Sequence, residues 1–391
     1  MRASYPAYKS TSIPWLPEMP EHWDVLKVKH IFQERSEKGY PDEPLLAATQ
    51  TKGVVRKEEY ETRTVTAQKD FHLLKLVKEE DFVISLRSFQ GGIEYAYHRG
   101  IISPAYTIFY ERNKVPVNKA FYRHLFKSHP FINSLTLFVT GIREGQNIDY
   151  AEFKDSLLPF PPLPEQTAIA NYLDAKTEQI NRFIEKKEKL IALLKEQKQA
   201  VINELLEDKE GKWERRKLKY ASKVLRGKFT HRPRNDDRLY GGKYPFIQTN
   251  SITSTEKYIT EYNQTLNEWG YSVSKEFPSN TVVMSIAANI ADIAILNFNG
   301  CFPDSIIGFV PNKTLDTEFL FYSLKAMKDY FYSIATINTQ LNLNIDKVAN
   351  SFIKLPDLTV QKRIVKDIEI ELGRIDSVIV QIQKEIEKLK N

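Results

Sequence analysis

The chain has 391 residues, 42% of them hydrophobic, and a formal net charge of +6 at pH 7. This length and apolar content predict two or three packed domains and exclude a disordered chain. The mild basic excess permits a nucleic-acid partner without requiring one. The single cysteine, Cys301, excludes an intrachain disulfide and a cysteine-based metal site within one chain.

The N-terminal sequence MRASYPAYKSTSIPW contains no apolar stretch typical of a secretory signal. No apolar run of about 18 residues occurs in the chain, so no membrane span is predicted. We therefore expect a cytoplasmic protein without a membrane partner.

Residues 1–160 are predicted to form the first globular domain. Short β-rich runs at 81–86 and 105–110 predict strands, and the amphipathic pattern at 118–129 predicts a short helix. Loops rich in glycine, asparagine and serine separate these runs. The mixture lacks the alternating βαβ rhythm of a doubly wound sheet and indicates an α+β fold.

Two loops of this domain carry side chains suited to reading DNA bases. LRSFQGG (86–92) follows a predicted strand and ends in a flexible pair of glycines, and GIREGQN (141–147) repeats its chemistry. Arginine reads guanine, and glutamine or asparagine reads adenine, through bidentate hydrogen bonds in the major groove. The alternative is an ordinary polar surface loop. The candidate residues are Arg87, Ser88, Gln90, Arg143, Gln146 and Asn147.

Four prolines at 159–164 end the first domain, and a polar, helix-forming run continues to about residue 205. Lys176, Lys187 and Gln197 interrupt its broad apolar stripe. At 1.5 Å per residue this helix would be roughly 65 Å long, and its stripe would need a partner. The stripe consists of Ile169, Leu173, Ile180, Phe183, Ile184, Leu190, Ile191, Leu194, Val201 and Leu205.

Residues 212–238 contain eleven Lys or Arg residues against three acids. Such clustering predicts contacts with phosphates, although a solvated basic surface strand is the alternative. The candidate phosphate contacts are Arg215, Arg216, Lys217, Lys228 and Arg232.

The second half of the chain repeats the first with a shift of about 190–200 residues. Gln50-Thr51 aligns with Gln248-Thr249, the predicted strand at 81–86 with that at 281–286, and Gln166 with Gln361. Their shared order predicts a second globular domain at 209–355, with strands at 281–286 and 306–310 and helical segments within 316–331. Its loops offer Asn289, Asn338 and Gln340 in place of the first domain's base-reading candidates.

Pro356 precedes a second long helix that runs to the C-terminus. Ile368, Ile375, Ile382 and Leu389 recur every seven residues, and Leu372, Ile379 and Ile386 form the interleaved series. This 4-3 alternation predicts a coiled-coil seam, most simply buried against the first long helix in an antiparallel pair. The predicted architecture is two globular α+β domains at opposite ends of two long antiparallel helices, with a pseudo-two-fold internal repeat and segments 1–160, 161–208, 209–355 and 356–391.

The sequence lacks the motifs of the common catalytic centres. It contains no P-loop, no G-x-G-x-x-G, and no H-E-x-x-H among its seven histidines. SPAY (103–106) is close to the S/D/N-P-P-Y/F tetrad of amino-methyltransferases, but Ala105 replaces the second proline and no glycine-rich cofactor loop precedes it. We therefore expect no catalytic residue, no metal and no cofactor.

With this doubled layout, the chain resembles the specificity subunits of type I restriction–modification systems over essentially its full length. The most specific piece is PPLPEQTAIANYLDAKTEQINRFIEKKEKLIALLKEQKQAVI at 161–202, and STSIPWLPEMPEHWDVLKVKHIF at 10–32 is similar to the segment that opens such subunits. The second helix, with PDLTVQKRI, is a looser match that keeps Gln361 of the Pro-Glu-Gln motif.

The resemblance implies two target-recognition domains, each reading one half of a bipartite double-stranded DNA target. It implies that the two helices set the spacer between the half-sites and dock two methyltransferase subunits, which restriction/translocase subunits join. The chain itself would be a non-catalytic DNA-binding subunit. Two alternatives are a coiled-coil adaptor that joins two protein-binding domains without DNA specificity, and a methyltransferase or nuclease with a divergent active site.

Overall fold

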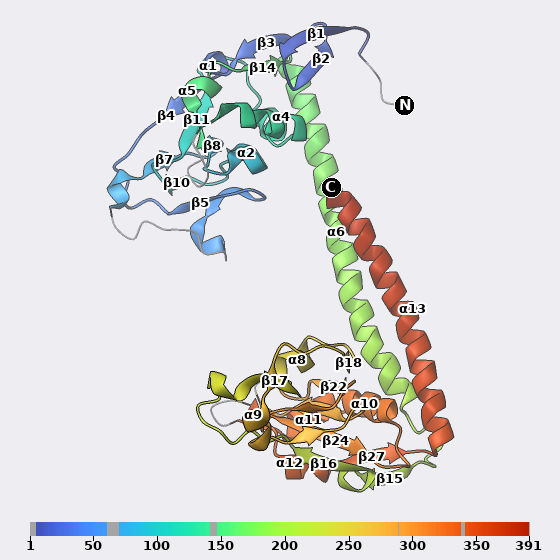
Figure 1. Ribbon diagram of the computed structural model, residues 1–391. Coiled ribbons are helices and arrows are strands. Elements are labelled where there is room, and N and C mark those ends of the chain that lie inside the picture. Colours follow the sequence, from blue (N-terminus) through green and yellow to red (C-terminus); the bar gives the residue numbers. More distant parts are fainter. Residues whose placement is uncertain (1–4, 61–69, 141–146, 288, 338–340, 391) are drawn as a thin grey trace. The chain divides into compact units, whose positions relative to one another are not determined.

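The computed structural model describes residues 5–60, 70–140, 147–287, 289–337 and 341–390. The chain divides into two compact units, residues 1–182 and 183–391. Both units mix helices with strands, as the sequence predicts (Figure 1). Among the described residues, no helix is long and apolar enough to cross a membrane.

The first unit contains a central four-stranded sheet in the order β4-β11-β8-β9, flanked by two-stranded pairs and short helices. The strands are β1 (Tyr8–Ile13), β2 (Leu16–Pro20), β3 (Asp24–Lys27), β4 (Phe32–Arg35), β5 (Leu46–Thr49), β6 (Gly53–Arg56), β7 (Lys75–Val77), β8 (Phe82–Ile84), β9 (Glu94–Tyr95), β10 (Gly100–Ile102), β11 (Thr107–Glu111), β12 (Val139–Thr140), β13 (Asn147–Ile148) and β14 (Leu157–Phe160). The helices are α1 (Val28–Ile31), α2 (Ser88–Gly91), α3 (Lys119–Leu125), α4 (His129–Ser134), α5 (Tyr150–Phe153) and α6 (Leu163–Leu205), the last of which continues into the second unit.

The second unit contains a central five-stranded sheet in the order β16-β24-β21-β22-β18. The strands are β15 (Glu214–Lys217), β16 (Ser222–Arg226), β17 (Tyr240–Pro245), β18 (Tyr258–Ile259), β19 (Thr265–Leu266), β20 (Glu276–Phe277), β21 (Val282–Ser285), β22 (Ile293–Leu296), β23 (Gly300–Cys301), β24 (Ile306–Pro311), β25 (Thr336–Ile337), β26 (Leu341–Asn342) and β27 (Phe352–Leu355). The helices are α7 (Leu218–Ala221), α8 (Thr249–Thr253), α9 (Glu268–Ser272), α10 (Thr317–Ala326), α11 (Lys328–Ile334), α12 (Ile345–Ala349) and α13 (Leu358–Lys390).

The two units repeat one order of elements, which confirms the predicted internal repeat. In the first unit, β3 pairs with β14, the last strand before α6, and a turn of helix then leads into β4. In the second unit, β15 pairs with β27, the last strand before α13, and a turn of helix leads into β16. The four predicted strands correspond to β8, β11, β21 and β24. The helical pattern at 316–331 forms two helices rather than one, because Met327 (φ −89°, ψ 9°) leaves the helical conformation between α10 and α11.

A buried glutamine fixes the start of each long helix in the same way. Gln166 Nε2 donates to the carbonyl of Pro161 at 2.8 Å, and its Oε1 accepts from the amide of Asn118, the residue that caps α3, at 2.8 Å. Gln361 donates to the carbonyl of Pro356 at 2.8 Å and accepts from the amide of Asp316, which caps α10, at 2.8 Å. Both glutamines have 0% exposed surface. The pairing of Gln166 with Gln361 in the sequence therefore has a structural cause.

In the second unit, α13 runs alongside α6 (Figure 1). Lys187 pairs with Glu385 at 2.9 Å and Lys198 with Asp376 at 2.7 Å. The residue numbers of the partners fall along α13 as those of α6 rise, so the two helices are antiparallel. The α13 seam is buried as predicted at Ile368, Ile375, Ile379, Ile382 and Ile386, whereas Leu389 is 37% exposed.

The buried stripe of α6 in the second unit is narrower than the sequence suggests. Phe183 and Leu190, which we assigned to it, are 45% and 40% exposed. The less exposed positions recur at alternating steps of three and four and include both lysines that pair with acids of α13. These positions are Ile184, Lys187, Ile191, Leu194, Lys198, Val201 and Leu205. Ile202, 3% exposed, is buried as well, against the core of the second unit. Polar pairs inside a seam specify register, because a shifted alignment would leave them unpaired.

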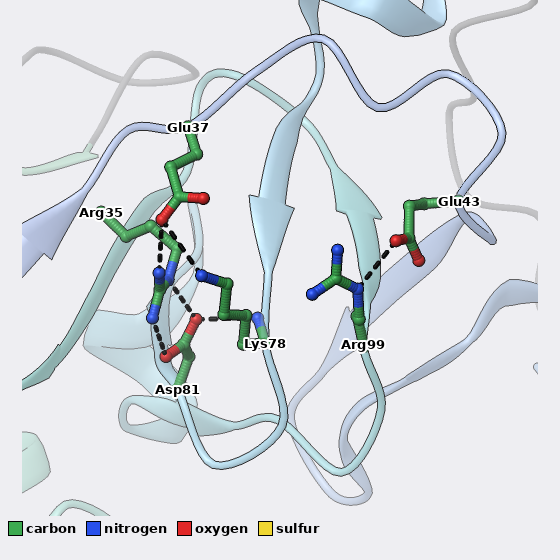
Figure 2. Close-up of polar contacts among 6 residues, drawn as sticks. All are labelled: Arg35, Glu37, Glu43, Lys78, Asp81 and Arg99. Carbon is green, nitrogen blue, oxygen red and sulfur yellow. Dashed lines mark hydrogen bonds and ion pairs between the residues drawn. The ribbon is translucent and has the colours of Figure 1, made fainter.

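An ion-pair cluster lies at the edge of the first unit's sheet (Figure 2). The buried Arg35 binds Asp81 through Nε at 2.8 Å and Nη2 at 3.1 Å, and Glu37 through Nη1 at 2.6 Å. Asp81 also accepts the amide of Lys78 at 2.8 Å. These bonds fix the turn that leads into β8. Glu43 and Arg99 form a separate pair at 2.7 Å nearby.

Candidate nucleic-acid interface

The loop that follows β8 in the first unit exposes two of the predicted base-reading residues. Arg87, the residue before α2, and Gln90, within α2, are both exposed. Ser88 is fully buried, and its hydroxyl accepts the amide of Ser85 at 2.8 Å. Ser88 thus closes the loop from inside and presents nothing to a ligand at the surface.

This loop is not the flexible glycine loop that the sequence suggested. Gly92 ends α2 with φ +80°, and a Cβ there would lie 2.3 Å from the carbonyl oxygen of Phe126. Glycine is therefore required for a close approach between two segments, and the loop has a defined conformation.

Two further segments of the first unit border this loop. Gln50 is exposed in the turn between β5 and β6, and a Cβ on Gly91 would lie 2.8 Å from its Cγ. α2 also lies against β13, which contains Asn147. Arg143 and Gln146 lie outside the described residues. The described parts of three segments, the turn at 50–52, α2 and β13, therefore form one surface.

The second unit assembles a surface from the corresponding segments. Asn289 is exposed in the loop after β21, and the hydroxyl of Ser285 donates to its carbonyl. Ala287 forms a β-bridge with Asn342, and the amide of Leu343 donates to the carbonyl of Ile286 at 2.9 Å. The loop after β21 is thus joined to the hairpin of β25 and β26. Asn338 and Gln340 lie outside the described residues.

The third segment of this surface is α8 with the preceding Gln248. Thr253 Oγ1 donates to Asp292 at 2.8 Å, which ties α8 to the loop after β21. Gln248 Nε2 donates to Gln264 Oε1 at 2.6 Å. In the sequence, Gln50 and Gln248 served only to align the two halves of the repeat. The structure shows that both are exposed at the same place in the two units, which sequence reasoning missed.

A polar cleft of about 330 Å³ lies beside Gln248. Amide and hydroxyl side chains line it together with an aromatic floor, and Arg234 stands at its rim. Such groups can hydrogen-bond base edges or phosphates. The polar lining residues that we add to the candidates are Arg234, Asn235, Gln248, Thr249, Gln264 and Ser305.

The basic stretch 212–238 does not form one continuous patch. Arg215, Arg216 and Lys217 lie on β15; the Arg215 guanidinium stacks 4.3 Å from the Phe352 ring, and Arg216 Nε donates to Glu214 at 2.9 Å. Three residues of the stretch, Phe229, Arg234 and Asn235, line the polar cleft beside Gln248.

Two more predicted phosphate contacts lie on the loop after β16. Lys228 is exposed. The guanidinium of Arg232 donates to the carbonyls of Phe229 at 2.7 Å and His231 at 2.8 Å, and lies 3.7 Å from Asp304. Arg232 is therefore partly engaged within the chain, whereas the side chain of Lys228 has no hydrogen bond or ion pair to the residues that the structure describes.

Behind the first surface lies an unusual carboxyl group. Glu94, on β9, has 0% exposed surface, and Lys127 Nζ lies 2.7 Å from its Oε2. Burial raises the pKa of Glu94 to about 7, although Lys127 acts in the opposite direction. Among the described residues, Glu94 Oε1 is a buried oxygen without a hydrogen-bond partner.

Comparison with known proteins accounts for this arrangement. Residues 210–388 match the family described as the type I restriction modification DNA specificity domain. The resemblance to type I specificity subunits is confirmed. Two solved structures share the fold: a chain from work on complex assembly and conformational transition of the type I R-M system (16% identity, 95% of each chain covered, TM-score 0.67), and the HsdS subunit from Thermoanaerobacter tengcongensis (16% identity, 95% of this chain and 94% of that chain covered, TM-score 0.54).

The long helices of the chain leave apolar side chains uncovered. On α13, Ile370, Val378 and Val380 are 43%, 45% and 47% exposed. On the second-unit part of α6, Leu193 is 52% exposed. A two-helix seam covers one stripe of each helix, and these side chains lie outside that stripe.

Proposed function

We propose that the chain is the non-catalytic, DNA-binding specificity subunit of a type I restriction–modification complex. Its domains at 1–160 and 209–355 each read one half of a bipartite double-stranded target. The observation that carries this proposal is the duplicated surface. In each unit, the segment after β8 or β21 contacts both the segment around Gln50 or Gln248 and the β12–β13 or β25–β26 hairpin, with arginine or amide side chains exposed.

The base contacts come from polar side chains of the loops assigned to these surfaces. In the first domain these are Arg87 and Gln90, joined by Arg143, Gln146 and Asn147 of the neighbouring loop. In the second domain they are Asn289, Asn338 and Gln340. Each bidentate pair contributes about 1–3 kcal/mol of discrimination against the wrong base. Ser88 is no longer a candidate for a base contact, because it is buried.

Backbone contacts come from the basic residues at 215–217, Lys228 and Arg232. Replacing Arg215, Arg216 and Lys217 together by glutamine should weaken binding of every DNA sequence about equally and reduce the slope of log affinity against log salt. A changed base preference with an unchanged salt slope would contradict this assignment.

The helical segments 161–208 and 356–391 set the spacer between the half-sites and dock two methyltransferase subunits, which restriction/translocase subunits then join. The uncovered apolar side chains of α6 and α13 support a protein partner there. Replacing Val378 and Val380 by serine, both nearly half exposed, should weaken methyltransferase binding in a pull-down without unfolding the chain. Unchanged binding would place the partner elsewhere.

Exchange of one domain tests the whole proposal. Residues 209–354 are replaced by the matching segment of a related subunit, and the modified sites are mapped genome-wide in cells that also carry the methyltransferase. One half-site should change while the other half-site and the spacer persist. An insertion within 165–205 should alter the spacer alone.

A change in both half-sites after the domain exchange would refute the modular assignment. A coiled-coil adaptor without DNA specificity remains the competing function, since it would have the same layout. It predicts that the assembled complex binds all DNA sequences equally weakly, whereas a specificity subunit distinguishes single base-pair changes in its target.

A further inference from the structure

A lysine behind the first surface joins its segments. Lys127 directly follows Phe126, the residue that ends α3. Its ammonium donates to Glu94 Oε2 at 2.7 Å, to the carbonyl of Gly91 at 2.7 Å and to the carbonyl of Gln50 at 3.1 Å. One cation with three donors thus ties the end of α2 and the turn at Gln50 to a strand of the central sheet.

The second unit has a similar acid–lysine pair, at a different position of the repeat. Lys328 is the first residue of α11 and follows Met327, the C-cap of α10. Its ammonium donates to Asp292 Oδ1 at 3.1 Å. The other oxygen of Asp292 accepts the hydroxyl of Thr253 on α8 at 2.8 Å. This pair ties the loop after β21 to α8, which contributes to the same surface.

The two acids occupy related but not identical positions. Glu94 faces Val83 across its strand pair, and the residue that faces Val283 is Ala294, two positions after Asp292. Side chains two residues apart lie on one face of an extended chain. The longer glutamate reaches the lysine from within the sheet, and the shorter aspartate reaches it from a position nearer the loop.

We infer that Glu94–Lys127 and Asp292–Lys328 are positioning pairs, each of which holds its own recognition loop in the geometry that reads its half-site. This inference rests on the proposed DNA-reading function. Each pair touches the segments that carry the exposed side chains. The side chain of Glu94 is 1% exposed and that of Lys127 30%. The side chains of Asp292 and Lys328 are 20% and 45% exposed. A shift of about 1 Å in such a loop is enough to break bidentate base contacts.

The Glu94–Lys127 pair is not explained by a contribution to folding stability alone. A fully buried carboxylate with an oxygen left unpartnered carries a desolvation penalty, and an apolar pair of similar volume is often neutral or stabilising. A directional pair instead holds several segments in one geometry. Its three acceptors, on three segments, match that role.

The test uses the chain assembled with its methyltransferase subunits and duplexes carrying the mapped target, with single base-pair changes in either half-site. K127M should lower discrimination at the first half-site by about tenfold, the size of one lost bidentate contact, and leave the second half-site unchanged. K328M should do the reverse. K127R, which retains a charged donor, should keep most of the discrimination.

K119M is the matched control, because Lys119 begins α3, the helix that precedes Lys127, and pairs with other acids, Glu80 at 2.9 Å and Glu111 at 2.8 Å. It should leave both half-sites unchanged. If K127M did not fold, E94Q, which keeps the side-chain shape, takes its place.

The outcomes separate the inference from the function on which it rests. If the parent chain discriminates but K127M loses affinity equally for all duplexes, the positioning role is wrong and the proposed function stands. Loss of discrimination at both half-sites in K127M would also overturn it. If the parent chain itself shows no discrimination at either half-site, the proposed function fails, and this inference fails with it.

Discussion

Replacing Glu94 by glutamine should remove a pH dependence from the stability of the first unit. Burial raises the pKa of this carboxyl group from 4.5 to about 7 in the folded chain. The folded state therefore binds more protons than the unfolded state between these two values. Stability is greatest below about pH 4.5, falls as the pH rises through about 7, and is level above that.

The magnitude follows from the same two values. The full difference corresponds to about 3 kcal/mol, of which about 2.5 kcal/mol falls between pH 5 and pH 8. Glutamine does not titrate, so the E94Q variant should lack this part of the profile. Other titrating groups contribute to both proteins and cancel in the comparison.

Tryptophan fluorescence can report the first unit alone. The chain has four tryptophans, and Trp15 packs edge-on against Phe131 in the core of the first unit at a centroid distance of 5.5 Å. With Trp213 and Trp269 of the second unit replaced by phenylalanine, urea unfolding at pH 5 and pH 8 follows that core.

The parent should lose about 2.5 kcal/mol more than E94Q between the two pH values. E80Q, at a side chain that is 56% exposed, should retain the parent's profile. Parallel pH profiles for the parent and E94Q would show that Glu94 keeps an ordinary pKa and would refute the reasoning.

Three further substitutions test the buried contacts that hold the fold together. Gln361→Leu leaves the amide of Asp316 and two carbonyls without their partner and should lower the stability of the second unit by about 3 kcal/mol in urea unfolding; an unchanged midpoint would contradict this. Asp81→Asn leaves Arg35 buried without its carboxylate and should cost about 3–5 kcal/mol in thermal unfolding, whereas a double change of both residues to apolar side chains should recover most of that loss. Ile379→Ala in the helical seam should cost about 2–4 kcal/mol, whereas Val378→Ala beside it, at a side chain that is 45% exposed, should change stability by less than about 0.5 kcal/mol; equal losses would contradict the seam.

The helices were the most predictable part of the fold, because their pattern is local. The α13 seam follows from a repeat of seven read along one segment, and its bounds in the structure, Leu358–Lys390, match the run after Pro356. The residues of the α6 seam were predicted less well. In a sequence, a lysine within an apolar stripe is taken as an interruption of the stripe. Lys187 and Lys198 belong to the seam, and only the acids on α13, nearly two hundred residues away, reveal this.

The candidate surfaces were predictable in composition but not in geometry. Arg87 and Gln90 are exposed as their loop context suggests, whereas Ser88 turns inward to bind Ser85. Gly92, at the end of the same loop, passes close to Phe126, a contact between segments that no local pattern encodes. The link between Glu94 and Lys127 was missed for the same reason, since thirty-three residues separate the two.

The two units differ in a way that separates framework from reading residues. They share the buried glutamine at the start of the long helix and a serine at the end of β8 or β21 (Ser85 and Ser285). They also share an acid–lysine pair next to the loop that follows this strand. They differ at the exposed positions, with arginine and glutamine in one unit and asparagine in the other. A duplicated domain that served only to join proteins would have no need to hold two different sets of exposed polar side chains in one common frame. A pair of domains that read different half-sites requires that combination, because discrimination resides in the exposed groups while their placement depends on the parts beneath them.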